Sequence, residues 1–315
     1  QANNSTSGPS VGVNVNCMPS LPSLPIPSGL PIPDVGSLTG LPPCDGSAQG
    51  PTPTSTPSPV PTPEPTPTPT PVPTPTPQLC LTPPNDLVSW WTGDNTANDA
   101  VGTNHGTLKN SASYQAGKVG DAFRFNGTTA YVEVPDSVSL DVPDAFTVNA
   151  WVQVDVLNVS QIIVSKGACK PNAIGYVFRL LTTTGGLKLS AQIGAPGATC
   201  GTINNGEETT TNAVITDTNF HHVALTYAGG TTKDIQFYVD GVEAQTQVVN
   251  PAPISVNNTD LPFLLGAALV DNAGGPSFPS GFLDGLLDEV QLFSRALSAS
   301  EISDIFTVGS EGQCK

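Results

Sequence analysis

The feature that most restricts this 315-residue chain is the tract at 51–77, in which nearly every second residue is proline. Proline fixes φ and lacks an N–H donor, so the tract cannot form a helix or an interior strand. We expect an extended polyproline-II stalk through residues 51–79, and its Pro/Thr part would reach roughly 80 Å at about 3.1 Å per residue. Threonines in such tracts are typical sites of O-linked sugars. The candidates are Thr52, Thr54, Thr62, Thr66, Thr68, Thr70, Thr74 and Thr76.

Residues 1–50, before the stalk, combine an alternating run at Val11, Val13 and Val15 with a mixture of Pro, Leu and Ile. One interpretation is a disordered leader. The other is an anchoring or assembly segment, because disordered tails are normally poor in apolar residues. Since an extended segment can add to an exposed sheet edge, Val11–Val15 is a candidate for pairing with a neighbouring copy and building a fibre.

Residues 80–315 have a different pattern, in which short runs alternate apolar and polar residues with the period of a β-strand. The runs are 87–91, 122–126, 130–134, 146–154, 161–166, 176–181, 187–193, 221–227, 234–240, 242–248, 263–269 and 286–294. The dipeptides Asn126-Gly127 and Asp240-Gly241 are tight-turn signals between such runs. Many strands separated by turns predict an all-β fold, an antiparallel two-sheet sandwich.

A single helix is predicted near the end of the chain. Ser298 and Glu301 have the spacing of a capping box, and Ile302 and Ile305 follow at helical spacing.

The charge balance excludes several classes of partner. Asp and Glu number 26 against 10 Lys and Arg, which gives a formal net charge of −16. Such a chain is repelled by nucleic acid and by anionic membrane surfaces. No run approaches the roughly 18–20 apolar residues of a membrane span. Because the sequence opens at Gln1, as a processed mature chain does, we expect a secreted protein, extracellular or at the cell surface.

The 6 cysteines favour disulfides over metal binding. They form no Cys-x-x-Cys pair and have no histidine at metal-ligand spacing, so a zinc site is not indicated. An even number in a chain of this kind suits an oxidising compartment, and six cysteines allow 15 connectivities. The pairs expected are Cys80 with Cys314, which bracket the folded region, Cys169 with Cys200, which flank an internal excursion, and Cys17 with Cys44, which close an N-terminal loop.

Five segments of the folded region resemble the laminin-G-like jelly roll of the concanavalin A-like lectin/glucanase superfamily. They are 87–108, 117–154, 219–230, 235–243 and 285–302, in the family's order, and the most specific is DEVQLFSRALSASEI at 288–302. The resemblance implies a two-sheet jelly roll whose termini lie close together, which supports the Cys80–Cys314 pair. A shared fold does not by itself define a function.

The resemblance also implies a possible calcium site. The residues that match the family's positions are Asp99, Asn104 and Asp288, and calcium takes 6–8 oxygen ligands of this kind. The alternative is structural, with Asp99 and Asn104 forming Asx-turns and Asp288 accepting a hydrogen bond from a loop N–H.

Catalysis is not predicted. Glucanases of the superfamily carry alternating carboxylates on one strand face, which flank the sugar bond, and no such run is present here. Asp288 and Glu289 are neighbours, so on a regular strand they point to opposite faces. Of Trp90, Trp91 and Trp151, two are expected in the core, with at least one of Trp90 and Trp91 among the inward-facing residues.

The leading hypothesis is a non-catalytic extracellular surface protein, structural or adhesive, that displays its jelly roll on the stalk and assembles into a fibre through residues 1–50. Its partners would be glycans or other copies of itself. The alternative is a calcium-dependent, lectin-like carbohydrate-binding module. Candidate N-glycosylation sites in the folded region are Asn126, Asn158 and Asn257.

Overall fold

The computed structural model describes residues 80–169, 173–195, 205–231, 234–250, 255–257, 259–270 and 277–315. The predicted segments 1–50 and 51–79 lie outside the described residues. So do the stalk threonines, the Cys17–Cys44 pair and Cys200.

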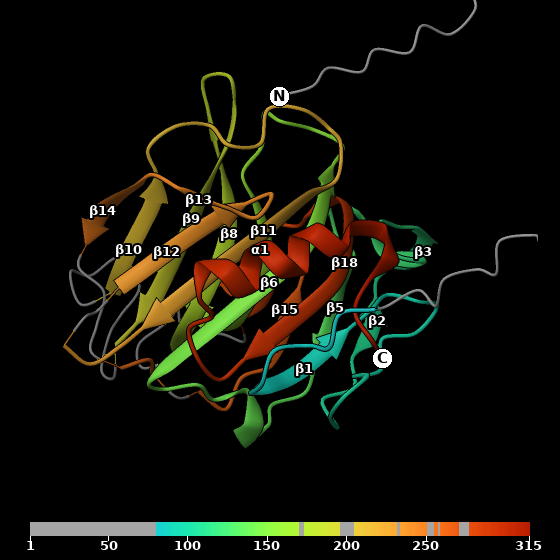
Figure 1. Ribbon diagram of the computed structural model, residues 1–315, viewed down its shortest axis with the longest axis horizontal. Helices are drawn as coiled ribbons and strands as arrows, with labels where there is room; N and C mark the ends of the chain where they lie inside the picture. The colour runs from blue at the N-terminus through green and yellow to red at the C-terminus, as the bar shows by residue number, and fades with distance from the viewer. Residues whose placement is uncertain are drawn as a thin grey trace, which may run out of the picture. The chain divides into compact units, whose positions relative to one another are not determined.

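The described chain forms two sheets that pack face to face (Figure 1). One sheet has 8 strands in the order β13-β12-β11-β6-β18-β4-β3, and β1 also pairs with β18. Its strands are β1 (Leu87–Trp91), β3 (Ser113–Ala116), β4 (Asp121–Asn126), β6 (Ala145–Val154), β11 (His221–Ala228), β12 (Asp234–Val239), β13 (Val242–Ala244) and β18 (Asp284–Phe293).

The second sheet has 10 strands in the order β14-β10-β9-β8-β7-β15-β5-β2, with β16 and β17 attached beside β7. Its strands are β2 (Thr107–Lys109), β5 (Tyr131–Val134), β7 (Gln161–Cys169), β8 (Ile174–Thr183), β9 (Gly186–Gly194), β10 (Asn205–Thr210), β14 (Thr246–Asn250), β15 (Phe263–Leu265), β16 (Ala268–Val270) and β17 (Phe278–Ser280). The strand pairs are antiparallel, apart from the short parallel contact of β16 with β7. The predicted antiparallel two-sheet class is therefore confirmed.

The core lies between the sheets and follows from the alternation in the sequence. Phe146, Phe178 and Phe237 come from the inner faces of β6, β8 and β12 and are fully buried. Burial of each such side chain contributes about 1.5–3 kcal/mol to folding. Trp91 stacks on Phe263 across the sandwich with ring centroids 5.1 Å apart.

Helix α1 (Ala299–Val308) lies across the outer face of the eight-stranded sheet, where Figure 1 shows it in red. It begins with the predicted capping box: Ser298 accepts from the backbone N–H of Glu301, and the Glu301 side chain accepts from the backbone N–H of Ser298. Ile302 and Ile305 are buried against the sheet. Two 3-10 turns complete the helical segments, η1 (Val138–Leu140) and η2 (Gly309–Glu311).

Two predicted strands are each divided in the structure. The run 242–248 becomes β13 and β14, which belong to different sheets. The run 263–269 becomes β15 and β16, because Gly266 takes a φ of +78° that ends the first strand. Asp240-Gly241 joins β12 to β13 as a hairpin, whereas Asn126-Gly127 leads from β4 in one sheet towards β5 in the other.

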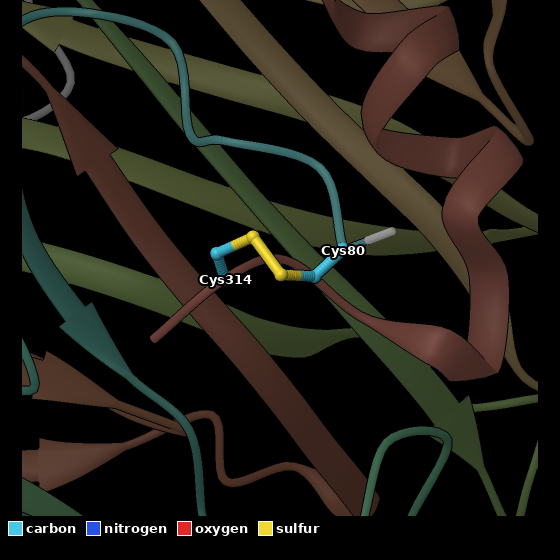
Figure 2. The surroundings of a disulfide bond; sticks show 2 residues. All are labelled: Cys80 and Cys314. Carbon is cyan, nitrogen blue, oxygen red and sulfur yellow. A yellow bond between two sulfur atoms is a disulfide. The ribbon is translucent and has the colours of Figure 1, made fainter. Parts of the chain in front are cut away.

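Cys80 and Cys314 form a disulfide with their Cα atoms 5.0 Å apart (Figure 2), so this predicted pair is confirmed. The backbone N–H of Cys314 also donates to the carbonyl of Leu81 at 2.9 Å. The first and last described segments are thus joined side by side. Within the described ranges, no helix has the length and apolar character of a membrane span.

Candidate binding groove

A groove of about 170 Å³ opens on the outer face of the ten-stranded sheet. Its floor is formed by Ile162 of β7, Val177 and Arg179 of β8, and Gln192 of β9. Its wall is the β16–β17 pair, which contributes residues 268–270 and Ser280. The groove therefore has a mixed floor and a largely apolar wall.

The floor follows from strand alternation. Tyr176, Phe178 and Leu180 of β8 are buried in the core, so the intervening Val177 and Arg179 project to the outer face. The wall arises because β16 pairs in parallel with the end of β7, where Leu269 lies opposite Ala168. The hairpin is thereby held beside the open face of β8 and β9.

Arg179 and Glu207 form an ion pair beside the groove. The Arg179 Nη2 and Glu207 Oε1 atoms are 2.5 Å apart, and the side chains are 25% and 21% exposed. The Arg179 Nε–H also donates to Ser190 Oγ at 3.3 Å. The register explains this meeting, since Ser190 lies opposite Arg179 on β9 and Glu207 comes from β10, the next strand.

Phe278 lies on the wall strand β17 and is 47% exposed. It is directly opposite Val270, a groove residue, so the two side chains share one face of the hairpin. This arrangement places an exposed aromatic ring on the wall hairpin, beside the groove lining but not part of it. The sequence prediction did not single out Phe278, because one aromatic in a segment rich in Gly, Pro and Ser has no periodic context.

Lys166 lines the groove with its stem and buries its ammonium group. The Nζ donates to the carbonyls of Thr259 and Leu261, at 2.6 Å each, and pairs with Asp136. A buried lysine needs such partners because its charge is costly to remove from water. Here it holds two loops against β7.

The structure brings two of the three predicted calcium ligands together. Asp99 Oδ1 accepts from the backbone N–H groups of Trp90 at 3.0 Å and Val101 at 3.1 Å, and Asp99 Oδ2 accepts from that of Asn104 at 3.2 Å. The Asn104 amide donates to Ser89 Oγ at 2.7 Å and also hydrogen-bonds to Ser139. The bond from Val101 to Asp99 is that of an Asx-turn.

The third candidate, Asp288, lies on β18, which β1 separates from Asp99. Its Oδ2 accepts from the backbone N–H groups of Lys118 and Val119, both at 2.8 Å. Across the described ranges, no group of three or more His, Cys, Asp or Glu is placed to hold a metal ion. These hydrogen bonds are the ones that the structural alternative describes, and calcium binding at these residues stays a prediction.

Asp288 and Glu289 occupy a β-bulge where β18 loses register with β6, and Glu289 has a φ of +51°. Burial raises the pKa of Asp288 to about 8 and that of Glu289 to about 7. Glu289 Oε2 accepts from the indole N–H of Trp90 at 2.5 Å, and its Oε1 lies 3.4 Å from Lys315 Nζ. In the interior, the Asp288 carboxyl thus binds backbone N–H groups and the Glu289 carboxyl binds side chains.

The tryptophans supply no exposed ring. Trp90, Trp91 and Trp151 are all buried, whereas two of the three were predicted to be in the core. Trp151 lies on the outer face of its sheet but is covered by the helix, with its ring centroid 5.7 Å from that of Phe306.

The three sequons in the folded region differ in exposure. Asn126 is exposed, and its Oδ1 accepts the backbone N–H groups of residues 128–130, so it shapes a turn. Asn158 is exposed in the loop before β7. Asn257 has a buried Nδ2, the atom that would carry the sugar, so its modification requires the loop to open. Glycosylation at each site stays a prediction.

Comparison with known proteins identifies a family. A family model described as the concanavalin A-like lectin/glucanases superfamily matches residues 126–303, more than half of the chain. No curated protein matched the chain.

Solved structures share the fold at low sequence identity. Domain 4 of AbnA, a GH43 extracellular arabinanase from Geobacillus stearothermophilus in complex with arabinotriose, has a TM-score of 0.52 and 21% identity over 70% of this chain and 97% of that one. The binding domain of Paraclostridial Mosquitocidal Protein 1 has a TM-score of 0.52 and 18% identity, over 70% of this chain and 52% of that one. The binding domain of botulinum neurotoxin DC in complex with SialylT has a TM-score of 0.51 and 10% identity, over 71% and 51%. The matched region thus spans about half of each toxin domain.

Proposed function

The chain belongs to the concanavalin A-like lectin/glucanases superfamily, and on that premise we propose that it is a non-catalytic, extracellular adhesive protein whose jelly roll binds glycans in the groove beside β16 and β17. The observation that carries the proposal is the combination of an apolar wall with a floor that presents Arg179 and Gln192. Binding sites for small ligands typically combine apolar surface with a few placed polar groups.

The groove's composition suits a sugar. A pyranose ring has an apolar face and a rim of hydroxyls, so it is recognised by an aromatic or aliphatic surface together with hydrogen-bonding side chains. Leu269 and Val270 line the groove with apolar surface, the exposed Phe278 ring on the same hairpin would extend it, and the Arg179–Glu207 pair supplies donors and acceptors. Two structures with this fold support the proposal, because one was solved with arabinotriose and the other with SialylT.

The absence of catalysis in this proposal rests on the groove's lining. Glycosidases use a pair of carboxyl groups about 5–9.5 Å apart, and no Asp or Glu is among the described residues that line this groove. In the described part of the chain, three carboxyls have strongly raised pKa values because of burial, and none lines the groove: Glu208 on β10, and Asp288 and Glu289, which backbone N–H groups and Trp90 occupy in another part of the fold.

Extracellular display is supported by the disulfide and by the stalk. Structural disulfides persist in oxidising compartments. A Pro/Thr stalk that carries O-linked sugars would hold the groove away from the attachment point. Calcium is not part of the proposal, because Asp99 and Asp288 already accept backbone N–H groups.

Self-assembly is a second candidate function. β14 ends its sheet, and a register shift beside Glu208 leaves Val248 and Val249 exposed there. Such an edge can accept an added strand, and Val11–Val15 has the alternation of one. Deleting residues 1–50 should then abolish multimers in negative-stain electron microscopy and sedimentation. Multimers that persist without these residues would exclude the N-terminal segment as the assembling element.

A glycan array followed by calorimetry tests the binding proposal. Phe278→Ala should lower affinity for the best glycan about three- to tenfold, the loss expected for one aromatic stacking contact. Val138→Ala removes an exposed apolar side chain from η1, away from the β16–β17 hairpin, and serves as the control. Binding that neither variant changes would place the glycan elsewhere, and an array with no hits would remove the proposal.

A further inference from the structure

Both cationic side chains that line the groove already have anionic partners. Lys166 pairs with Asp136 and donates to two carbonyls, and Arg179 pairs with Glu207. We propose that this neutralisation makes the groove select neutral glycans over anionic ones, with Glu207 as the residue that determines the selectivity. The inference rests on the proposed glycan-binding function of the groove.

The geometry of the Arg179–Glu207 pair supports this role. Its 2.5 Å contact is a charge-assisted hydrogen bond, and the bond from Nε to Ser190 Oγ fixes the guanidinium plane. An anionic sugar would have to displace the Glu207 carboxylate to gain the same contact. A neutral sugar does not, because its hydroxyls can donate to Glu207 and accept from Arg179 while the pair stays intact.

Lys166 cannot take over the recognition of an anion. Its ammonium group is buried, and its three donors are used by Asp136, Thr259 and Leu261. The groove therefore has no unpaired cation among its described lining residues, Arg179 and Lys166 being the only basic ones. The net charge of −16 adds long-range repulsion of anionic ligands.

The test compares wild type with Glu207→Gln on pairs of oligosaccharides that differ only by a terminal uronate or sialate. Wild type should bind each neutral member at least about tenfold more tightly than its anionic counterpart. The reason is that the anionic sugar would have to break the charged hydrogen bond between Arg179 and Glu207. Glu207→Gln should free Arg179 to bind the carboxylate of the anionic sugar. The preference for the neutral member should then disappear or reverse. The double variant Arg179→Met/Glu207→Gln should lose the gain.

Glu133→Gln is the matched control. Glu133 lies on β5 of the same sheet and pairs with Lys109 at 2.9 Å, so the substitution makes the same change in net charge outside the groove lining. It should leave the preference as in wild type. Equal affinity of wild type for both members, or an unchanged preference in Glu207→Gln, would overturn the inference.

Failure of the proposed function is distinguishable from failure of this inference. If no oligosaccharide binds either protein, glycan binding is excluded, and inorganic sulfate then becomes the probe of the pair. The NMR signal of Arg179 Nε–H should shift with sulfate in Glu207→Gln and stay unchanged in wild type. A wild-type shift of the same size would show that Arg179 is not neutralised. Thermal melts of each variant verify that the domain is folded.

Discussion

At the residue scale, buried polar groups are matched to particular backbone groups. Asp99 is 6% exposed and accepts three backbone N–H groups, one from Trp90 of β1 and two from the following loop. Gly102 lies so close that a Cβ there would come within 2.6 Å of Asp99 Oδ2. This carboxylate organises the loop through its hydrogen bonds to the backbone.

Asp99→Ala should therefore destabilise the domain by about 3 kcal/mol, because it leaves buried N–H donors without acceptors. Urea unfolding measures the loss. The same experiment with added calcium and with a chelator should give identical midpoints for wild type. A chelator-sensitive midpoint in wild type that Asp99→Ala abolishes would instead establish Asp99 as a calcium ligand.

His222 gives a pH dependence whose sign can be worked out. It is fully buried beneath α1, with its Nε2 3.4 Å from Asn149 Oδ1. Burial lowers its pKa from 6.5 to about 4. Between these values the unfolded chain binds a proton that the folded chain does not, so this contribution is present above pH 6.5 and is lost as pH falls towards 4.

The stability difference between wild type and His222→Gln should thus shrink by about 2–3 kcal/mol from pH 7.5 to pH 4.5. Measuring both proteins at each pH isolates His222, because the raised pKa values of Asp288 and Glu289 act in the opposite direction. A difference that is constant with pH would show that His222 can be protonated in the folded state.

At the element scale, the alternation of apolar and polar residues predicted the long strands but not the groove. The runs 146–154 and 286–294 became β6 and β18 because each has a face buried in the core. The run 242–248 gave no sign that its halves belong to different sheets, since both halves keep the same period. The groove could not be predicted, because its floor at Ile162 and its wall at Leu269 meet only through the pairing of β7 with β16.

The predicted Cys169–Cys200 disulfide belongs to this scale, although Cys200 lies outside the described residues. β7 ends at Cys169 and β9 ends at Gly194, with β8 between them at the same end of the sheet. Non-reducing peptide mapping should recover the 169–200 pair. Replacing both residues with serine should cost about 3 kcal/mol, since the pair closes a loop of roughly 30 residues. Recovery of Cys169 as a free thiol would contradict the pairing.

At the scale of the whole molecule, the Cys80–Cys314 disulfide lies at the first described residue, which in sequence directly follows the predicted stalk. It links residues 234 apart in sequence and holds the first described segment beside the last. Lys315 continues the connection through ion pairs with Asp94 and Glu289. We therefore expect force applied to the chain at Cys80 to reach the C-terminal segment through the disulfide before it detaches β1 from β18.

Cys80→Ser/Cys314→Ser should lower the free energy of unfolding by about 3–5 kcal/mol, because the bridge restricts a long loop in the unfolded chain. It should also raise hydrogen exchange in β1 and in residues 309–315 ahead of the core strands β6 and β11. Single-molecule pulling from the stalk then gives the sharpest comparison. Wild type should resist until the sheets separate, whereas the variant should show an earlier, weaker event as β1 detaches. Identical force traces would mean that β1 is held by its pairing with β18 alone and that the disulfide carries no load.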